Sequence, residues 1–184
     1  VALPFARERK HAILGPWRRL VLGPYFSENG ELRPTEQASV GLEDIEYQYG
    51  YGVYETLKIR QGVIYFLERH AERLLASADI IALEHWLSRQ EIIRFVTSLA
   101  EANELNNANI KILLIGSAHP DRPDAARLYI MAISPLFPDR RLYKQGARAV
   151  TFAGERLYPQ AKSLSMTVSA MAMKEARRAE AYDA

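Results

Sequence analysis

One lysine of this 184-residue chain stands in a stretch that could make it chemically reactive. The stretch RLYPQAKSLSMTVSAMAMKEA, residues 156–176, places Lys162 between Ala161 and Ser163, just ahead of a helical pattern. Small neighbours can desolvate an amine, and desolvation favours the neutral form that attacks a carbonyl group. Lys162 could therefore be a Schiff-base amine, although an ordinary solvated lysine in a loop has the same spacing.

A second group of polar candidates lies on a predicted helix. Six apolar residues recur at helical spacing, and they are Leu67, Ala71, Leu74, Leu75, Ala78 and Ile81. This stripe predicts an amphipathic helix over about residues 67–83. His70, Arg73 and Ser77 follow i, i+3, i+7 spacing and so share a different face of that helix. That face is either part of a site or a solvated polar surface.

A tyrosine precedes this helix on a predicted strand. The segment VYETLKIR alternates with a period of two, so Val53, Leu57 and Ile59 fall on one face and Tyr54 on the other. A Gln-Gly turn follows and VIYFL returns, which predicts a hairpin over residues 53–67. Tyr54 is then either an exposed aromatic of this hairpin or a packed one.

Further turn and capping signals predict a chain of mixed helices and strands. Asn29-Gly30 lies between two short apolar runs and predicts a hairpin turn. Ser88 and Glu91 have the spacing of a capping box, which predicts a second helix ending near Asn103. The segments NIKILLIGS and RLYIMAIS, which come next, are predicted strands joined by a loop.

The pattern divides the chain into three predicted parts. Residues 1–19 are predicted to be a basic arm and residues 20–137 an N-terminal α+β domain. The segment SPLFPDRR carries two prolines and several charges after a strand, so residues 138–184 are predicted to hold a linker and the start of a second domain. We expect a strand over residues 147–153 and an alanine-rich helix from Val168 to about Ala181.

The composition excludes several classes of function. The apolar fraction of 48% and the charged fraction of 25% are those of a globular protein. The net charge of +2 comes from 24 basic and 22 acidic residues that are well mixed, which disfavours nucleic acid as a partner. The absence of cysteine excludes disulfides and thiolate zinc sites, and we predict no metal site. No apolar run approaches the ~18 residues of a membrane span, so we expect a cytoplasmic protein without a membrane partner.

Two segments of the chain resemble one enzyme family. GYGVYETLKIRQGVIYFLERHAERLLASADIIALE, residues 50–84, resembles the N-terminal core of the class IV (fold-type IV) pyridoxal-phosphate enzymes. AKSLSMTVSAMAMKEARRAEAYDA resembles the lysine segment of the same family, which includes branched-chain and D-amino acid aminotransferases and aminodeoxychorismate lyases. The resemblance covers about residues 22–184. It implies an α+β fold: the two-layer small domain of such an enzyme, plus the first strand and helix of the larger cofactor domain.

The resemblance also implies a cofactor, a reaction and residue roles. The cofactor would be pyridoxal 5'-phosphate, and the reaction amino transfer between an amino acid and a 2-oxo acid in a homodimer. Lys162 would bind the cofactor covalently at C4′ and move the proton between Cα and C4′. Arg73 would bind the cofactor phosphate, which its planar fork suits, and Tyr54 would line the pocket near the substrate carboxylate. His70 is expected to be structural, and His119 lies where the family often selects substrates.

The chain departs from the family pattern in several places. Ile45-Glu46 and Tyr51 replace charged and glycine steps that the family commonly has, and Ile115 replaces an arginine. The glutamate that pairs with the pyridine nitrogen, and further phosphate donors, lie beyond the point where this sequence stops. We therefore expect these 184 residues to be inactive or nearly so when alone. The alternatives are a pyruvate-eliminating lyase of the aminodeoxychorismate type and a catalytically dead scaffold.

Overall fold

The computed structural model describes residues 21–40, 49–117, 125–135 and 137–184. The predicted basic arm over residues 1–19, the Ile45-Glu46 step and His119 lie outside these residues. Within them, no helix is both long and apolar enough to cross a membrane.

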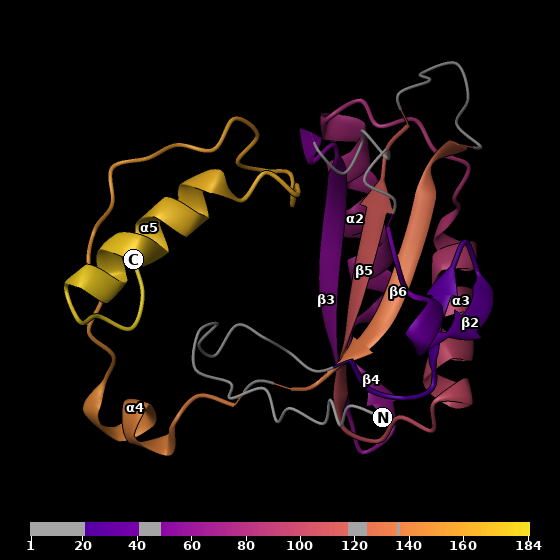
Figure 1. Cartoon of the computed structure of the whole chain (residues 1–184), viewed down its shortest axis with the longest axis horizontal. Helices are drawn as coiled ribbons and strands as arrows, with labels where there is room; N and C mark the ends of the chain where they lie inside the picture. The colour runs from indigo at the N-terminus through magenta and orange to yellow at the C-terminus, as the bar shows by residue number, and fades with distance from the viewer. Residues whose placement is uncertain (1–20, 41–48, 118–124, 136) are drawn as a thin grey trace, which may run out of the picture.

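In the part of the chain that the structure describes, six antiparallel strands form one sheet in the order β2-β1-β6-β5-β3-β4. The strands are β1 (Tyr25–Glu28), β2 (Glu31–Pro34), β3 (Gly52–Arg60), β4 (Val63–Ile64), β5 (Ala108–Ile115) and β6 (Arg127–Ile133). Two helices, α2 (Leu67–Ile80) and α3 (Arg89–Ala102), cover one face of this sheet (Figure 1). The predicted two-layer α+β arrangement is therefore confirmed.

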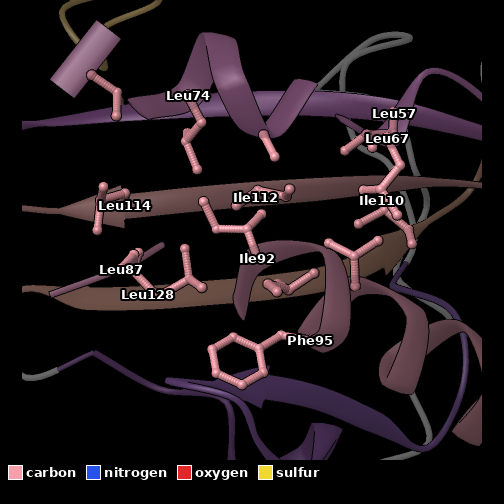
Figure 2. Packing of buried hydrophobic residues seen from close by; sticks show 14 of the residues in the cluster. Leu57, Leu67, Leu74, Leu87, Ile92, Phe95, Ile110, Ile112, Leu114 and Leu128 are labelled. Carbon is pink, nitrogen blue, oxygen red and sulfur yellow. The ribbon is translucent and has the colours of Figure 1, made fainter. Parts of the chain in front are cut away.

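The apolar core lies between the sheet and these two helices. Its fully buried residues come from the inner faces of both layers, and they include Leu57, Leu74, Ile92, Leu99, Ile110, Ile112, Leu114 and Leu128. Figure 2 shows part of this core, with Leu74, Ile92 and Ile112 among the side chains that lie between the helices and the central strands. Alternation on β3 and β5 thus places one residue in two against the helices, as the period of two predicted.

Local sequence signals set the boundaries of several elements. Asn29 and Gly30 have φ angles of 52° and 90°, which is the left-handed pair that a two-residue hairpin between β1 and β2 requires. A Cβ atom on Gly30 would lie 2.3 Å from Cε1 of Phe95, so packing also demands glycine there. At α3 the capping box of Ser88 and Glu91 is formed in both directions, as predicted.

Three predictions for the rest of the chain need correction. The strand predicted over residues 147–153 is wrong: only Ala149 forms a bridge, to Asp183, because no longer partner strand lies beside it. The predicted linker contains a short helix, α4 (Arg140–Gln145), which Asp139 caps by accepting a hydrogen bond from the Arg141 amide. The returning strand β4 is only two residues long, because α2 begins at Leu67. The alanine-rich helix is confirmed as α5 (Thr167–Arg178).

Candidate active site

The segment that carries Lys162 is attached to the edge of β3 by a single antiparallel bridge. The Tyr54 amide donates to the carbonyl of Lys162 at 2.9 Å, and the Leu164 amide donates to the carbonyl of Gly52 at 2.8 Å. An antiparallel bridge joins Val53 to Ser163 between them. β4 pairs with β3 only at Ile59 and Arg60, so the edge of β3 around Val53 is left for the lysine segment. Figure 1 shows the chain ahead of α5 returning to β3 in this way.

A glycine on β3 allows this close approach. A Cβ atom on Gly52 would lie 2.6 Å from the Leu114 carbonyl oxygen and 2.8 Å from Cδ1 of Leu164. Both distances are too short for carbon, so a side chain here would have to displace the backbone of β5 and the Leu164 side chain of the lysine segment. Ala161 is 1% exposed, which shows that the segment is packed at this point.

Helix α2 fixes the lysine segment from its other side. The Lys162 amide donates to Oγ of Ser77 at 3.1 Å, and the Ser77 side chain is buried. Lys162 is therefore held through both of its backbone polar groups, by Tyr54 on the sheet and by Ser77 on the helix. The buried Ser77 hydroxyl is therefore satisfied by accepting a hydrogen bond from the lysine segment.

The amine of Lys162 lies over the ring of Tyr54. Nζ is 4.3 Å from the ring centroid, which is a cation–π geometry. The tyrosine hydroxyl contacts Sδ of Met166 at 3.6 Å, so the Tyr54 side chain meets both Lys162 and Met166. The structure therefore brings the two predicted site residues, Tyr54 and Lys162, into contact.

The next residue of β3 is a buried carboxylate that the sequence reasoning missed. Glu55 is inaccessible to solvent and accepts hydrogen bonds from Arg73 through Nε at 2.5 Å and Nη2 at 2.7 Å. Nδ1 of His70 lies 2.8 Å from the same carboxylate. Because an ionised carboxylate only accepts hydrogen bonds, Nδ1 of His70 must carry the proton. The missed signal was a glutamate at an apolar position of the alternating strand, between Val53 and Leu57.

These contacts keep the cluster charged. Burial alone raises the pKa of Glu55, but the hydrogen bonds from Arg73 and His70 outweigh it and hold the pKa below the ordinary glutamate value. The same carboxylate raises the pKa of Arg73 through its hydrogen bonds, against the opposing effect of burial. Glu55 and Arg73 therefore form a charge-assisted, two-pronged pair at neutral pH.

Arg73 still has a free edge in this pair. Its hydrogen bonds to Glu55 use Nε and Nη2, and its side chain is 55% exposed. Arg73 and Ser77 stand one helical turn apart on α2, so the guanidinium lies close to the point where Lys162 is anchored. His70, Arg73 and Ser77 do share one face of the helix, as the spacing predicted, because all three reach toward β3 or the lysine segment.

The residues present fit a cofactor that needs an amine and an anion site. Lys162 offers an amine on a fixed backbone, and the exposed edge of Arg73 offers a guanidinium for a phosphate. Ile115, which stands where the family has an arginine, is 2% exposed and packs with Phe26 and Tyr129. It therefore cannot supply a polar contact to a ligand.

A hollow of about 680 Å³ elsewhere in the molecule does not contain these groups. It lies between α4 and α5 and is lined by residues such as Phe137, Leu142, Met173 and Tyr182. Neither Lys162, Tyr54 nor Arg73 borders it. The candidate active site is therefore placed by the chemistry of its side chains rather than by the size of a cavity.

Comparison with known proteins identifies the family of this chain. The family described as amino-transferase class IV matches residues 52–184. The D-alanine aminotransferase of Bacillus licheniformis is 29% identical over 161 residues, which cover 85% of this chain and 57% of that protein. A putative branched-chain-amino-acid aminotransferase of Methanocaldococcus jannaschii is also 29% identical, over 82% of this chain and 55% of its own length. The chain thus spans little more than half the length of these relatives.

Solved structures show the same fold. A branched-chain amino acid aminotransferase solved with pyridoxamine 5'-phosphate matches with a TM-score of 0.78 at 22% identity, over 89% of this chain and 59% of that one. The branched-chain amino acid aminotransferase of Escherichia coli matches with a TM-score of 0.76 at 23% identity, over 86% of this chain and 58% of that one. With the match of residues 52–184 and the placement of Lys162, the chain belongs to the class IV aminotransferase family.

Proposed function

We propose that this chain carries the reactive lysine of a pyridoxal-phosphate-dependent aminotransferase, which moves an amino group between an amino acid and a 2-oxo acid. The observation that supports this most directly is the position of Lys162. Its backbone is fixed by Tyr54 and Ser77, and its Nζ lies 4.3 Å from the Tyr54 ring. A lysine on a free surface loop has no need of such anchoring.

Each residue of the site would have one task. Lys162 would attach the cofactor through Nζ and, once displaced by the incoming amine, would hold and return the proton of the substrate carbon. Pyridoxal phosphate, when bound, withdraws electrons from that carbon and so makes its proton removable. Tyr54 would confine Nζ to one side of its ring and border the substrate.

Arg73 would bind the cofactor phosphate with the edge that Glu55 does not use. Glu55 and His70 hold the guanidinium plane in one orientation, so less side-chain entropy is lost when an anion binds. Glu55 also offsets the positive charge of Arg73, so the pair alone presents little net charge. We propose that the phosphate relies on additional donors, which the longer relatives have room to supply.

We further propose that turnover belongs to a longer, homodimeric protein and that these 184 residues have little activity alone. The chain covers only 57% and 55% of the lengths of these two relatives, which supports a longer protein. A stoichiometric cofactor complex of the 184 residues that also turns over substrate would contradict the prediction of low activity.

A cofactor titration tests the proposed role of Lys162. Pyridoxal phosphate should give absorbance at roughly 410–430 nm, and borohydride reduction should fix the label on the peptide that contains Lys162. Lys162→Ala should abolish the absorbance and the label, whereas Lys174→Ala, at an exposed position on α5, should keep both. Labelling that survives Lys162→Ala would refute the role.

Activity assays separate the proposed reaction from its alternatives. In the full-length natural form, exchange between an amino acid and 2-oxoglutarate would show an aminotransferase, and pyruvate release without exchange would show a lyase. Unchanged biological activity of Lys162→Ala in that form would instead favour a scaffold without catalysis.

A further inference from the structure

One methionine touches the candidate site through its sulfur. Met166 lies directly ahead of α5, and its Sδ is 3.6 Å from the hydroxyl of Tyr54. The ring of the same tyrosine lies under Nζ of Lys162, which is 4.3 Å from the ring centroid. Met166 is 45% exposed, so a small reagent in solution can reach its side chain. The thioether therefore combines contact with a site residue and access from solvent.

The sulfur chemistry of this chain rests on methionine. The sequence has no cysteine and four methionines, which are Met131, Met166, Met171 and Met173. Met166 and Met171 are exposed, whereas Met131 and Met173 are half-buried. A thioether must meet its oxidant, so the exposed pair should oxidise first. Met171 stands five residues further along α5 and points in a different direction, which makes it an internal reference.

Oxidation would change the contact between Met166 and Tyr54. A thioether is a weak hydrogen-bond acceptor, so the present O–H···S contact holds the tyrosine loosely. Hydrogen peroxide transfers one oxygen atom to Sδ: sulfur loses two electrons, the O–O bond of the peroxide breaks, and water leaves. The sulfoxide oxygen is a polar acceptor, and a reductase can remove it again. The flexible methionine side chain can bring this oxygen to the ordinary O–H···O distance of about 2.7 Å.

We propose that Met166 is a site of reversible oxidation by peroxides, and that its sulfoxide restrains Tyr54 and slows the reactions of the Lys162 amine. The restraint comes from the hydrogen bond that Tyr54 donates to the sulfoxide oxygen. The effect reaches Lys162 because Nζ lies over the same ring. A negatively polarised oxygen close to an amine favours the ammonium form, which does not attack carbonyl groups. The inference concerns side chains of this chain alone, so it does not rest on the proposed reaction.

Limited peroxide treatment followed by peptide mass spectrometry tests the modification itself. In the cofactor-free 184-residue chain, we expect Met166 and Met171 to oxidise at least about threefold faster than Met131 and Met173. The NMR ring resonances of Tyr54 should shift as the sulfoxide of Met166 accumulates, and methionine sulfoxide reductase should reverse the shift. Equal rates at all four methionines, or a slower rate at Met166 than at the half-buried pair, would overturn the proposal.

Two leucine variants locate the origin of the shift. Met166→Leu keeps an apolar side chain of similar size that cannot take up oxygen. Peroxide should still oxidise Met171 in this variant but leave the Tyr54 resonances unchanged. Met171→Leu is the matched control and should retain the wild-type shift. Tyr54→Phe should lose most of the shift, since its ring has no hydroxyl to donate. A shift that persists in Met166→Leu, or that is undiminished in Tyr54→Phe, would disprove the contact.

Amine reactivity tests the effect on Lys162. Formaldehyde with cyanoborohydride methylates accessible amines without any cofactor, and mass spectrometry quantifies each lysine. Oxidation of the wild type should slow methylation of Lys162 about threefold, and Met166→Leu should abolish this slowing. Lys174, exposed on α5, should react at one rate before and after oxidation. An unchanged rate at Lys162, or equal slowing at Lys174, would overturn the inference. Loss of cofactor labelling in untreated wild type would instead overturn the proposed function.

Discussion

Tyr54 and Glu55 are adjacent on β3 but lie in opposite environments. Tyr54 faces away from the helices, is half-buried, and is approached by Lys162 and Lys111. Glu55 faces α2, is fully buried, and has its carboxylate occupied by Arg73 and His70. One strand therefore presents a candidate reaction surface on one side and a charged structural cluster on the other.

The two faces differ in the surroundings of their charged side chains. On the Glu55 face, a buried carboxylate is satisfied by short hydrogen bonds from a half-exposed Arg73 and from His70, so its position is fixed. On the Tyr54 face, the half-buried Lys162 and Lys111 bring their amines to the same aromatic ring. The comparison suggests that the first face orients groups and the second one reacts, and substitutions can test that division.

The largest effect is expected from Glu55→Gln. This change leaves Arg73 and His70 without their ionised partner at a buried position, and we expect the free energy of unfolding to fall by about 2–4 kcal/mol at pH 7. Urea unfolding measures the loss. Glu72→Gln is the control, because Glu72 pairs with Arg89 at an exposed position and should cost less than about 1 kcal/mol.

The stability difference between the wild type and Glu55→Gln should depend on pH. The folded protein holds the pKa of Glu55 below the ordinary value of 4.5, so its stabilisation is complete above that pH. It is lost as the pH falls through the lower pKa of the folded state. The gap in stability between wild type and Glu55→Gln should therefore narrow below pH 4.5. A gap that stays constant down to pH 3 would show that Glu55 is not stabilised as a carboxylate.

A smaller effect is expected from Ser77→Ala, because Ser77 on α2 contacts the segment that brings Lys162 to the Tyr54 face. The Lys162 amide would lose its acceptor, at a cost of about 1–3 kcal/mol. Hydrogen exchange should speed up at the amides of Lys162 and Tyr54, because their segment is held by this contact. Ser165→Ala, at an exposed position, should leave that exchange unchanged. Equal protection in Ser77→Ala would mean that the sheet contacts alone hold the lysine.

The smallest effect is expected from Tyr54→Phe. The hydroxyl contacts only a weak sulfur acceptor, so its removal should change stability by less than about 0.5 kcal/mol. The ring itself should matter more, because Tyr54→Leu removes the surface over which Nζ of Lys162 lies. Upfield NMR shifts of the Lys162 side-chain protons should persist in Tyr54→Phe and vanish in Tyr54→Leu. Their loss in both variants would contradict the cation–π contact.

Local signals were sufficient to predict much of the fold. The turn at Asn29-Gly30, the capping box of Ser88 and Glu91, and the stripe of α2 each depend on a few neighbouring residues. The pairing of Val53 with Ser163 depends on residues over a hundred positions apart, and nothing in either segment specifies the other. The same limit explains why local patterns alone could not predict the contact between Lys162 and Tyr54.

The sequence singled out individual residues of the candidate site but not the contacts between them. Lys162, Tyr54 and Arg73 were chosen by residue type and resemblance, and the structure adds that Glu55 orients Arg73 and that Ser77 anchors Lys162. Glu55 could have been noticed, since a carboxylate on the apolar face of a strand needs a cationic partner. Lys111 could not, because its proximity to Tyr54 follows from the register of β5 on β3.

The attachment of the lysine segment to β3 has a consequence for insertions and deletions. Backbone hydrogen bonds recognise any sequence, so only the register decides which side chain of the segment meets Tyr54. A slip of one residue would send Lys162 to the helix side and bring a neighbour without an amine to the ring. The register of the lysine segment on β3 therefore decides which side chain reaches the ring, and the contacts at Gly52 and Ser77 hold that register.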